Sequence, residues 1–175
     1  SDTITNEVVR AVQISRDDWN SSELSWNFGK FALLPNRGNS KRLEQCVIEF
    51  NENNKKATDE LKAIEERVNS SYLSHYSLGK ELSGIVELKN ITLIRNLDFT
   101  YSGRTLGSDY VKIFSKDLVL ELVSYFVGCL FGRYSIDAEG VILGSLSETL
   151  DDYFNVIPEP SIYPDKDNVV PIIQT

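Results

Sequence analysis

Few side chains in this sequence are of the types that carry out chemistry. There is one histidine, His75, and there are two cysteines, Cys46 and Cys129. A zinc site of the usual Cys/His type needs more ligands than these three residues supply. His75 falls between Tyr72 and Tyr76 at the predicted end of a long helix, with no nucleophile or orienting carboxylate indicated nearby. We therefore expect His75 to have an electrostatic or packing role rather than a catalytic one.

The sequence also lacks the short motifs that place catalytic or cofactor-binding groups. It contains no Gly-x-x-x-x-Gly-Lys-Ser/Thr phosphate loop, no Gly-x-Gly-x-x-Gly dinucleotide motif and no Gly-x-Ser-x-Gly elbow. Asp165 and Asp167 form a carboxylate pair, but the ligand series of a calcium loop is absent, so a solvated surface loop is the better interpretation. We expect no catalytic residue, no cofactor-binding residue and no metal ligand in this chain.

Four basic residues in or beside predicted loops are candidates for binding phosphate groups: Arg37, Lys41, Arg42 and Arg104. The alternative for each of them is simple solvation at the surface. The chain as a whole is acidic, with 26 acidic and 18 basic residues and a formal net charge of −8. This charge argues against a stand-alone, non-specific nucleic-acid binder, although it allows a local basic patch.

Three aromatic residues near the N-terminus allow two interpretations. Trp19, Trp26 and Phe28 could stack on unpaired bases, as in proteins that bind single strands. They could instead form a hydrophobic latch onto the predicted helices. No basic residues are interleaved among them, so we expect the latch.

A long helix dominates the predicted fold. Apolar or small residues recur at steps of three and four, which is a heptad pattern typical of a helix with a packing seam. We expect this helix over about residues 40–77, with Ser40 as the N-cap and Gly79 as the left-handed residue at the C-terminal end. Asn54 holds a seam position, where it would fix the register of packing. The seam residues are Leu43, Val47, Phe50, Asn54, Ala57, Leu61, Ile64, Val68 and Tyr72.

A second helix is predicted over about residues 116–132, with Ser115 as its N-cap. It is apolar nearly all round, so we expect it to be buried on most sides and to pack against the seam of the long helix. Gly128 and Gly132 would allow the close approach. The helix is too short and too interrupted by Glu121 to span a bilayer.

The remaining segments give weaker signals. Ile4–Ile14 suits a strand and a helix equally well, Leu24–Phe28 suits a short strand or an extended packing segment, and residues 91–101 suggest one or two short strands. Prolines make residues 138–175 an irregular tail. We predict a mainly α (α+β) fold in a single domain, residues 1–175, with Cys46 and Cys129 as free, buried thiols in a reducing, cytoplasmic setting.

Three segments together resemble a known family. The first runs from Ile14 to Phe28, and the second, Leu61–Leu82, is the end of the predicted long helix. The third and most specific is Ser124–Asp137, with its Val-Gly-Cys-Leu-Phe-Gly-Arg-Tyr-Ser run, completed by Pro164–Ile172. In this order they resemble the part downstream of the catalytic domain in the PglX-type adenine-specific DNA methyltransferases of BREX phage defence, which are also described as methylase subunits of type II restriction enzymes.

The resemblance implies a function without implying catalysis by this chain. The methyl-donor loop and the Asn-Pro-Pro-Tyr pocket of the family do not appear here, and the sequence has no Pro-Pro pair. A protein of this family would use S-adenosylmethionine, whereas no cofactor is expected for this segment. The chain starts at Ser1 and has no methionine, so we expect a segment of a larger protein.

The implied role is a helical connector that helps to engage DNA, with the remaining domains of the methyltransferase and other defence-system proteins as partners and no membrane. The alternative is a coiled-coil-type interaction scaffold, in which a second copy or a defence-system protein completes the seam of the long helix.

Overall fold

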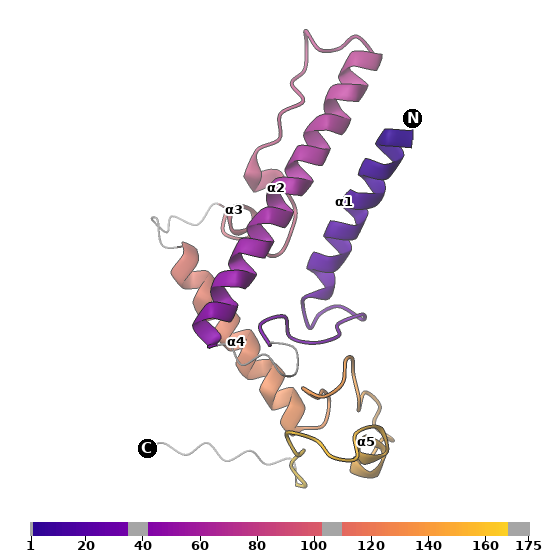
Figure 1. The fold of residues 1–175 in the computed structure, drawn as a ribbon, viewed down its shortest axis with the longest axis vertical. Helices are drawn as coiled ribbons and strands as arrows, with labels where there is room; N and C mark the ends of the chain where they lie inside the picture. The colour runs from indigo at the N-terminus through magenta and orange to yellow at the C-terminus, as the bar shows by residue number, and fades with distance from the viewer. Residues whose placement is uncertain (1, 35–41, 103–109, 168–175) are drawn as a thin grey trace. The chain divides into compact units, whose positions relative to one another are not determined.

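A computed structural model describes residues 2–34, 42–102 and 110–167 of the chain. The elements in order are α1 (Asp2–Asn20), α2 (Leu43–His75), the 3-10 helix η1 (Leu88–Asn90), α3 (Leu97–Thr100), α4 (Tyr110–Leu130) and α5 (Leu150–Val156) (Figure 1). The described residues contain no strand, so the mainly helical prediction is confirmed and the predicted short strands are wrong. None of these helices combines the length and apolar character needed to cross a membrane.

The chain divides into two compact units. Unit 1 comprises Ser1–Trp19 and Arg42–Phe114, and unit 2 comprises Asn20–Lys41 and Ser115–Thr175. Unit 1 therefore contains α1, α2, η1, α3 and the first turn of α4, and unit 2 contains the rest of α4 and α5. That the whole chain forms one domain stays a prediction.

The ambiguous segment Ile4–Ile14 is helical and lies within α1. Ile14 is buried and Ala11, three residues earlier, packs against the same core, whereas Val8 and Val12 are exposed. Ser15 lies inside the helix, where its hydroxyl donates to the carbonyl of Ala11 at 3.0 Å. This segment forms a helix rather than a strand because α2 provides a long apolar surface against which one side of a helix can be buried.

α1 and α2 pair antiparallel in unit 1. Arg10 donates two hydrogen bonds to the Glu60 carboxylate, at 2.6 and 2.7 Å, and Arg67 donates two to Glu7, at 2.9 and 2.7 Å. Arg10 comes after Glu7 in α1, whereas its partner Glu60 comes before Arg67 in α2. The two helices therefore run in opposite directions. Each pair uses both oxygens of a carboxylate, the geometry that holds two helices in one register.

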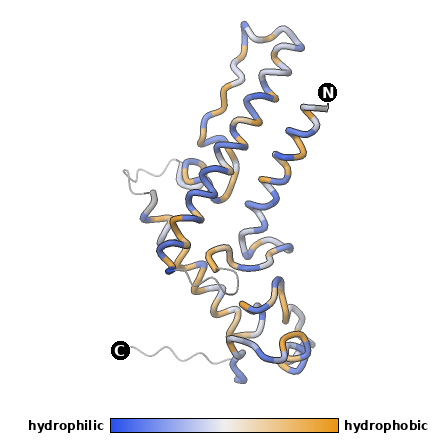
Figure 2. The backbone as a smooth tube through the Cα atoms, in the orientation of Figure 1, coloured by the Kyte–Doolittle hydropathy of each residue, from blue (hydrophilic) through white to orange (hydrophobic). Residues whose placement is uncertain are grey.

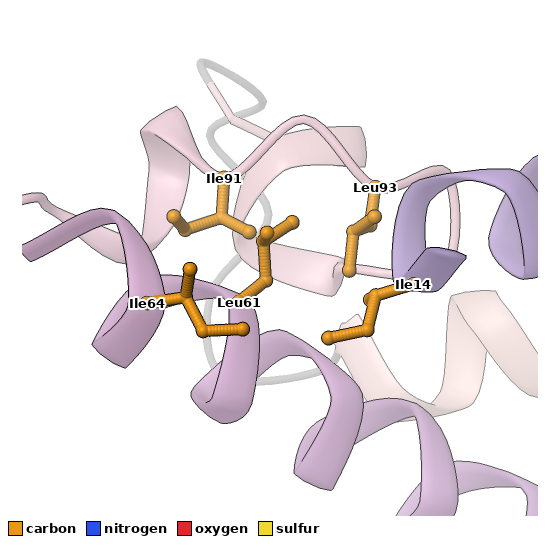
Figure 3. Close-up of a cluster of buried hydrophobic side chains, with 5 residues drawn as sticks. All are labelled: Ile14, Leu61, Ile64, Ile91 and Leu93. Carbon is orange, nitrogen blue, oxygen red and sulfur yellow. The ribbon is translucent and has the colours of Figure 1, made fainter. Parts of the chain in front are cut away.

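The core of unit 1 lies where α1, α2 and the segment after α2 meet. Figure 3 shows its five buried side chains, which are Ile14 from α1, Leu61 and Ile64 from α2, and Ile91 and Leu93 from the returning segment. The middle of the predicted seam is therefore buried, while its ends at Leu43 and Tyr72 are exposed. Packing of the full heptad pattern stays a prediction.

Both ends of α2 differ from the predicted caps. The helix begins at Leu43, and the N-cap is Arg42 rather than Ser40, which lies outside the described residues. At the other end the left-handed residue is Ser77, with φ 57°, and not Gly79. The N–H of Ser77 bonds to Ser74 O at 3.2 Å, and that of Leu78 bonds to Leu73 O at 2.9 Å. These are the two hydrogen bonds of a Schellman motif, formed here with serine where glycine is usual.

The segment after α2 returns along that helix and is fastened by side chains that bind its backbone. Glu66 accepts from the Val86 N–H at 3.0 Å. Asp18, at the end of α1, accepts from the N–H groups of Ile94 at 2.7 Å and Arg95 at 3.0 Å. Buried Asn96 donates to the carbonyls of Leu88 and Ile91 and caps α3 by accepting from Asp98. The segment was predicted to contain strands, but its backbone groups bond to these side chains instead of to a neighbouring strand.

α4 begins at Tyr110, so Ser115 lies inside the helix and is not its N-cap. In Figure 2, orange hydrophobic stretches of α4 alternate with blue hydrophilic ones. Leu118, Tyr125 and Cys129 are buried, whereas Val119, Leu120 and Val123 are exposed, and burial of this helix on most sides stays a prediction. Within unit 1, Phe114 stacks parallel to Phe50 of α2, with ring centroids 6.4 Å apart. Packing of the remainder of α4 against α2 stays a prediction.

Unit 2 has its own core of aromatic side chains. Phe28 packs edge-on against Tyr125 and Tyr134, at centroid distances of 6.0 and 5.4 Å, and Phe31 stacks on Tyr125. Gly128 leaves room for this core, since a Cβ there would lie 2.5 Å from Tyr134 Cδ2. Gly128 thus serves close packing within unit 2. The Ser124–Asp137 run, which carries the family resemblance, therefore contributes Tyr125, Gly128 and Tyr134 to this core.

The latch prediction holds for only one of its three aromatic residues. Phe28 is 3% exposed, whereas Trp26 is 100% exposed and Trp19 is about half exposed at 49%. Leu24–Phe28 is a series of turns, in which Ser25 Oγ donates to Asn20 Oδ1 at 2.6 Å and the Phe28 N–H bonds to Ser25 O at 3.2 Å. These turns direct Phe28 inward and leave Trp26 in solvent.

The tail is less irregular than predicted. α4 ends at Leu130, and Gly132 follows it with a φ of 73°, which suits the left-handed position after a helix. α5 then begins with a capping box between Thr149 and Asp152 and ends before Pro158. Asp137 accepts two hydrogen bonds from Ser161, at 2.6 and 2.7 Å, which holds the following loop to unit 2.

We expect Asp18→Ala to lower the free energy of unfolding by about 2–4 kcal/mol, because two partly buried N–H groups lose a charged acceptor. Asp17→Ala is the matched control. Asp17 is exposed and accepts from Gln13 on its own helix, so its removal should change stability by about 0.5 kcal/mol or less. Urea unfolding measures both. Equal losses would contradict the role assigned to Asp18.

A second pair tests the aromatic core. Phe28→Ala should cost about 3–5 kcal/mol of unfolding free energy, the usual result of emptying a buried aromatic site. Trp26→Ala, two residues away, should cost about 0.5 kcal/mol or less because the indole is in solvent. Thermal and urea unfolding of the two variants measure this difference in stability. A large loss of stability in Trp26→Ala would support the prediction that Trp26 is part of a hydrophobic latch.

Candidate functional site

The best-formed pocket of unit 1 lies between α2, the η1–α3 segment and the first turn of α4. Its volume is about 340 Å³, which falls in the lower part of the range for small-molecule sites. α2 contributes Asn51, Glu52, Asn54, Lys55, Thr58 and Asp59, and the other elements contribute Leu88, Arg95, Asn96, Leu97, Asp98 and Phe114. All of these residues belong to unit 1. We call this cavity the asparagine pocket.

Helical spacing brings the polar residues of α2 to one wall. Asn51, Asn54 and Thr58 are separated by three and four residues, so they share a face of the helix. Thr58 Oγ1 donates to the carbonyl of Asn54 at 2.9 Å, which satisfies its hydroxyl within the helix. Asn54 was predicted to be a register-setting residue of the packing seam. The structure places it on the wall of the pocket.

Two buried side-chain atoms in this wall have no hydrogen-bond partner among the described residues. They are Asn51 Oδ1, an acceptor, and Asn54 Nδ2, a donor. A buried polar atom without a partner costs about 1–3 kcal/mol, so native structures keep few of them. The two residues are one helical turn apart on α2, and the two atoms themselves are buried away from solvent.

Arg95 supplies a buried positive charge to the pocket. The residue is only 7% exposed, and its guanidinium carbon lies 5.5 Å from the centre of the Phe50 ring. Its backbone is held by Asp18. Burial raises the pKa of the Asp18 carboxyl, while the two backbone N–H groups and the Arg95 charge oppose that rise. Arg95 is thus fixed at both its backbone and its side chain.

The polar part of the pocket lining consists of charged, amide and hydroxyl side chains. His75 is not part of the pocket lining; it is exposed and packs edge-on against Tyr76. Cys46 and Cys129 are both free and buried, as predicted. Burial raises the pKa of Cys129 to about 11, which keeps its thiol protonated and unreactive at neutral pH. In the described part of the chain no three Cys, His, Asp or Glu side chains gather as metal ligands would.

Of the four predicted phosphate contacts, the structure describes one. Arg42 is exposed and occupies the N-cap position of α2, where its side chain makes no capping hydrogen bond. Arg37, Lys41 and Arg104 lie outside the described residues. Their convergence with Arg42 on a common surface therefore stays a prediction.

Sequence analysis missed Asn51 and Arg95. Arg95 stands alone in the apolar run Ile91-Thr92-Leu93-Ile94-Arg95-Asn96-Leu97, and a lone charge in such a run is a usable signal for a buried functional group. Asn51 gave no signal, because asparagine on a helix surface is ordinary.

Unit 2 has a groove of about 490 Å³, lined by Glu23–Trp26, Arg133, Tyr134, Val141, Leu143 and Gly144. Glu23 Oε2 accepts from Ser124 Oγ at 3.3 Å, whereas Oε1 is buried and has no donor within the described residues. Burial raises the pKa of Glu23, and Ser124 and Arg133 oppose that rise. This groove combines a carboxylate, the Arg133 guanidinium and the exposed Trp26 indole.

Comparison with known proteins gives two relatives that match most of the chain. It is 35% identical over 150 residues, 84% of its length, to the adenine-specific methyltransferase PglX of Lacticaseibacillus casei (strain Zhang). It is 32% identical over 133 residues, 76% of its length, to the adenine-specific methyltransferase BrxX of Escherichia coli O9:H4 (strain HS). The aligned part is 11% of each relative's length. No family model matches the chain. The resemblance to the PglX-type methyltransferases is confirmed.

Proposed function

Because most of this chain is similar to a region of the PglX-type adenine-specific methyltransferases, we propose that it is a non-catalytic helical connector of such a protein, which acts in a phage-defence system. The whole methyltransferase would bind S-adenosylmethionine and methylate adenine in DNA. The connector would join the methylating part to regions that grip the flanking duplex, with the other domains and defence-system proteins as partners. The proposed location is the cytoplasm.

The observation that carries this proposal is the braced helix pair of unit 1. α2 has 33 residues, so it is about 50 Å long. α1 is joined to it by the Ile14–Leu61–Ile64 core and by two bidentate ion pairs. Such a braced pair resists bending and can hold two attached regions at a set distance. That property matters to an enzyme that must extract a base from a duplex at one point while gripping the DNA elsewhere.

The chemistry of the chain supports a non-catalytic role. Its sequence contains no methyl-donor loop and no Asn-Pro-Pro-Tyr pocket. The residues assigned to DNA in this proposal are Arg37, Lys41, Arg42 and Arg104, with Arg42 at the N-terminal end of α2, where the helix dipole also favours a phosphate.

Charge reversal tests the DNA contacts. A PglX-type methyltransferase carrying this region, with Arg37, Lys41, Arg42 and Arg104 all changed to Glu, should bind duplex DNA more weakly in gel shifts. The slope of log affinity against log salt should fall by about 3–4 if all four neutralise phosphates. The matched control reverses four exposed lysines elsewhere: Lys56, Lys80, Lys116 and Lys166. Equal effects of the two sets, or no effect of the first, would exclude these contacts.

The second candidate function is an interaction scaffold, in which another chain completes an apolar surface. The observation that favours it is the exposure of Val119, Leu120 and Val123 on α4. Exposed apolar residues on one helix are typical of surfaces that pair with another protein. An occupant could be a second copy of the chain or another defence-system protein.

Sedimentation velocity separates the two functions. A connector whose helices pair within the chain should sediment as a monomer at all concentrations. A scaffold formed by two copies should dimerise, and Val123→Lys should dissociate it because the ammonium group would be buried in the interface. A dimer that is lost in this variant would favour the scaffold over the connector.

A further inference from the structure

Most of the surface that lines the asparagine pocket is apolar. Leu88 on η1 is 37% exposed, Leu97 on α3 is half-buried, and Phe114 in the first turn of α4 completes this apolar wall. Phe114 is held by its parallel stack on Phe50, with an interplanar angle of 3°. All of these residues belong to unit 1, so the geometry of the wall does not depend on unit 2.

The polar groups of the lining are engaged or out of reach. Thr58 Oγ1 and Asn96 Nδ2 both donate to backbone carbonyls, and Arg95 has interactions of its own within the chain. The unpartnered atoms of Asn51 and Asn54 are buried away from solvent, so an occupant of the pocket does not reach them. Small-molecule sites usually add a few well-placed polar groups to an apolar wall. This pocket therefore suits an apolar side chain of another protein better than a polar small molecule.

Exposed charged residues surround the apolar wall. Glu52 and Asp59 come from α2 and Asp98 comes from α3, with Lys55 as the exposed basic residue between the two on α2. None of the three carboxylates forms an ion pair with another described residue. Three carboxylates against one ammonium group leave the rim negative. The rim therefore attracts a basic partner and repels an acidic one.

We infer that the asparagine pocket is a docking site for a segment of a partner protein in which a large apolar side chain is flanked by lysine or arginine. The apolar side chain inserts between Leu88, Leu97 and Phe114, and the basic side chains lie against the carboxylates of the rim. An apolar anchor in a formed pocket with a polar rim is the usual arrangement at the centre of a protein interface. This inference goes beyond the connector function, which uses the helix pair and the four basic residues.

Fluorescence anisotropy of labelled peptides, titrated with the full chain, tests the inference. The probe is Lys-Lys-Phe-Leu-Lys-Lys, and the controls are Lys-Lys-Ser-Ser-Lys-Lys, which lacks the anchor, and Glu-Glu-Phe-Leu-Glu-Glu, which has the opposite charge. We expect the probe to bind with a Kd on the order of 1 mM or tighter and each control to bind at least about tenfold more weakly. If the probe does not bind, or if the peptide without the anchor binds equally well, the inference is wrong.

Neutralising the rim tests where the probe binds. The combined variant Glu52→Gln, Asp59→Asn and Asp98→Asn should weaken binding of the probe by at least about tenfold. The matched control removes three charges from exposed residues of unit 1 that do not line the pocket, with the changes Asp17→Asn, Glu44→Gln and Glu81→Gln. It should change affinity by about twofold or less, because charges far from the site are screened by salt. Equal effects of the two sets would exclude the rim as the binding surface.

The apolar wall has its own pair of variants. Leu88→Ser should weaken binding of the probe, whereas Ile85→Ser should not, because Ile85 is 77% exposed and does not line the pocket. Thermal unfolding of both variants checks that they are folded. If a folded Leu88→Ser variant binds the probe as well as the unchanged chain does, the apolar anchor is excluded.

Two other occupants give different results. If a second copy fills the pocket, the full chain should dimerise in sedimentation velocity and Leu88→Ser should dissociate the dimer. If another domain of the same protein fills it, the probe should bind the full chain but not a PglX-type methyltransferase that carries this region. Either result would overturn docking of a partner protein. The connector function would survive, because its own test uses DNA and other residues.

Discussion

The Asp18 carboxylate is the interaction on which the arrangement of unit 1 depends. It lies two residues before the end of α1 and accepts the N–H groups of Ile94 and Arg95, which come from a segment more than 70 residues later in the chain. That segment has no strand partner for its backbone, so the carboxylate replaces one. The same contact places Ile91 and Leu93 in the core beside Ile14. It also orients Arg95 towards Phe50 and the asparagine pocket. A single polar side chain thus connects the core to the pocket.

Unit 2 is organised by a different constraint, which is the space left by glycine. The ring of Tyr134 occupies the position that a side chain at Gly128 would take, and Tyr125 donates from its hydroxyl to the Ser135 carbonyl at 2.9 Å. The turn at Gly132 then reverses the chain. These residues fall in the run by which the chain resembles the PglX-type methyltransferases. The specificity of that run therefore has a packing explanation, and it does not require that the run contact DNA.

How far prediction succeeded depended on whether the pattern was local. The long helix and the apolar helix were predicted because their periodicity extends over several turns, and both are present with ends shifted by a few residues. Caps were predicted poorly: α2 begins after Arg42 rather than Ser40, its left-handed residue is Ser77 rather than Gly79, and α4 begins five residues before Ser115. Residues 91–101 alternate like strands, yet the described residues contain no second strand, and side chains bind the backbone instead. An alternating sequence pattern does not show whether a second strand is present to pair with the segment.

The sequence by itself determined the helical class, the two main helices, the free and buried thiols, and the resemblance to adenine-specific methyltransferases. Each of these follows from residue types at short spacing or from the order of residues in a run. Only the tertiary structure decided that Ile4–Ile14 is helical, that Phe28 is buried while Trp26 is exposed, and that Asn51, Asn54 and Arg95 line one pocket. The physical reason is that burial depends on which surfaces meet. Arg95 and Asn51 are 44 residues apart in the chain, and only the return of the chain along α2 brings them to one cavity.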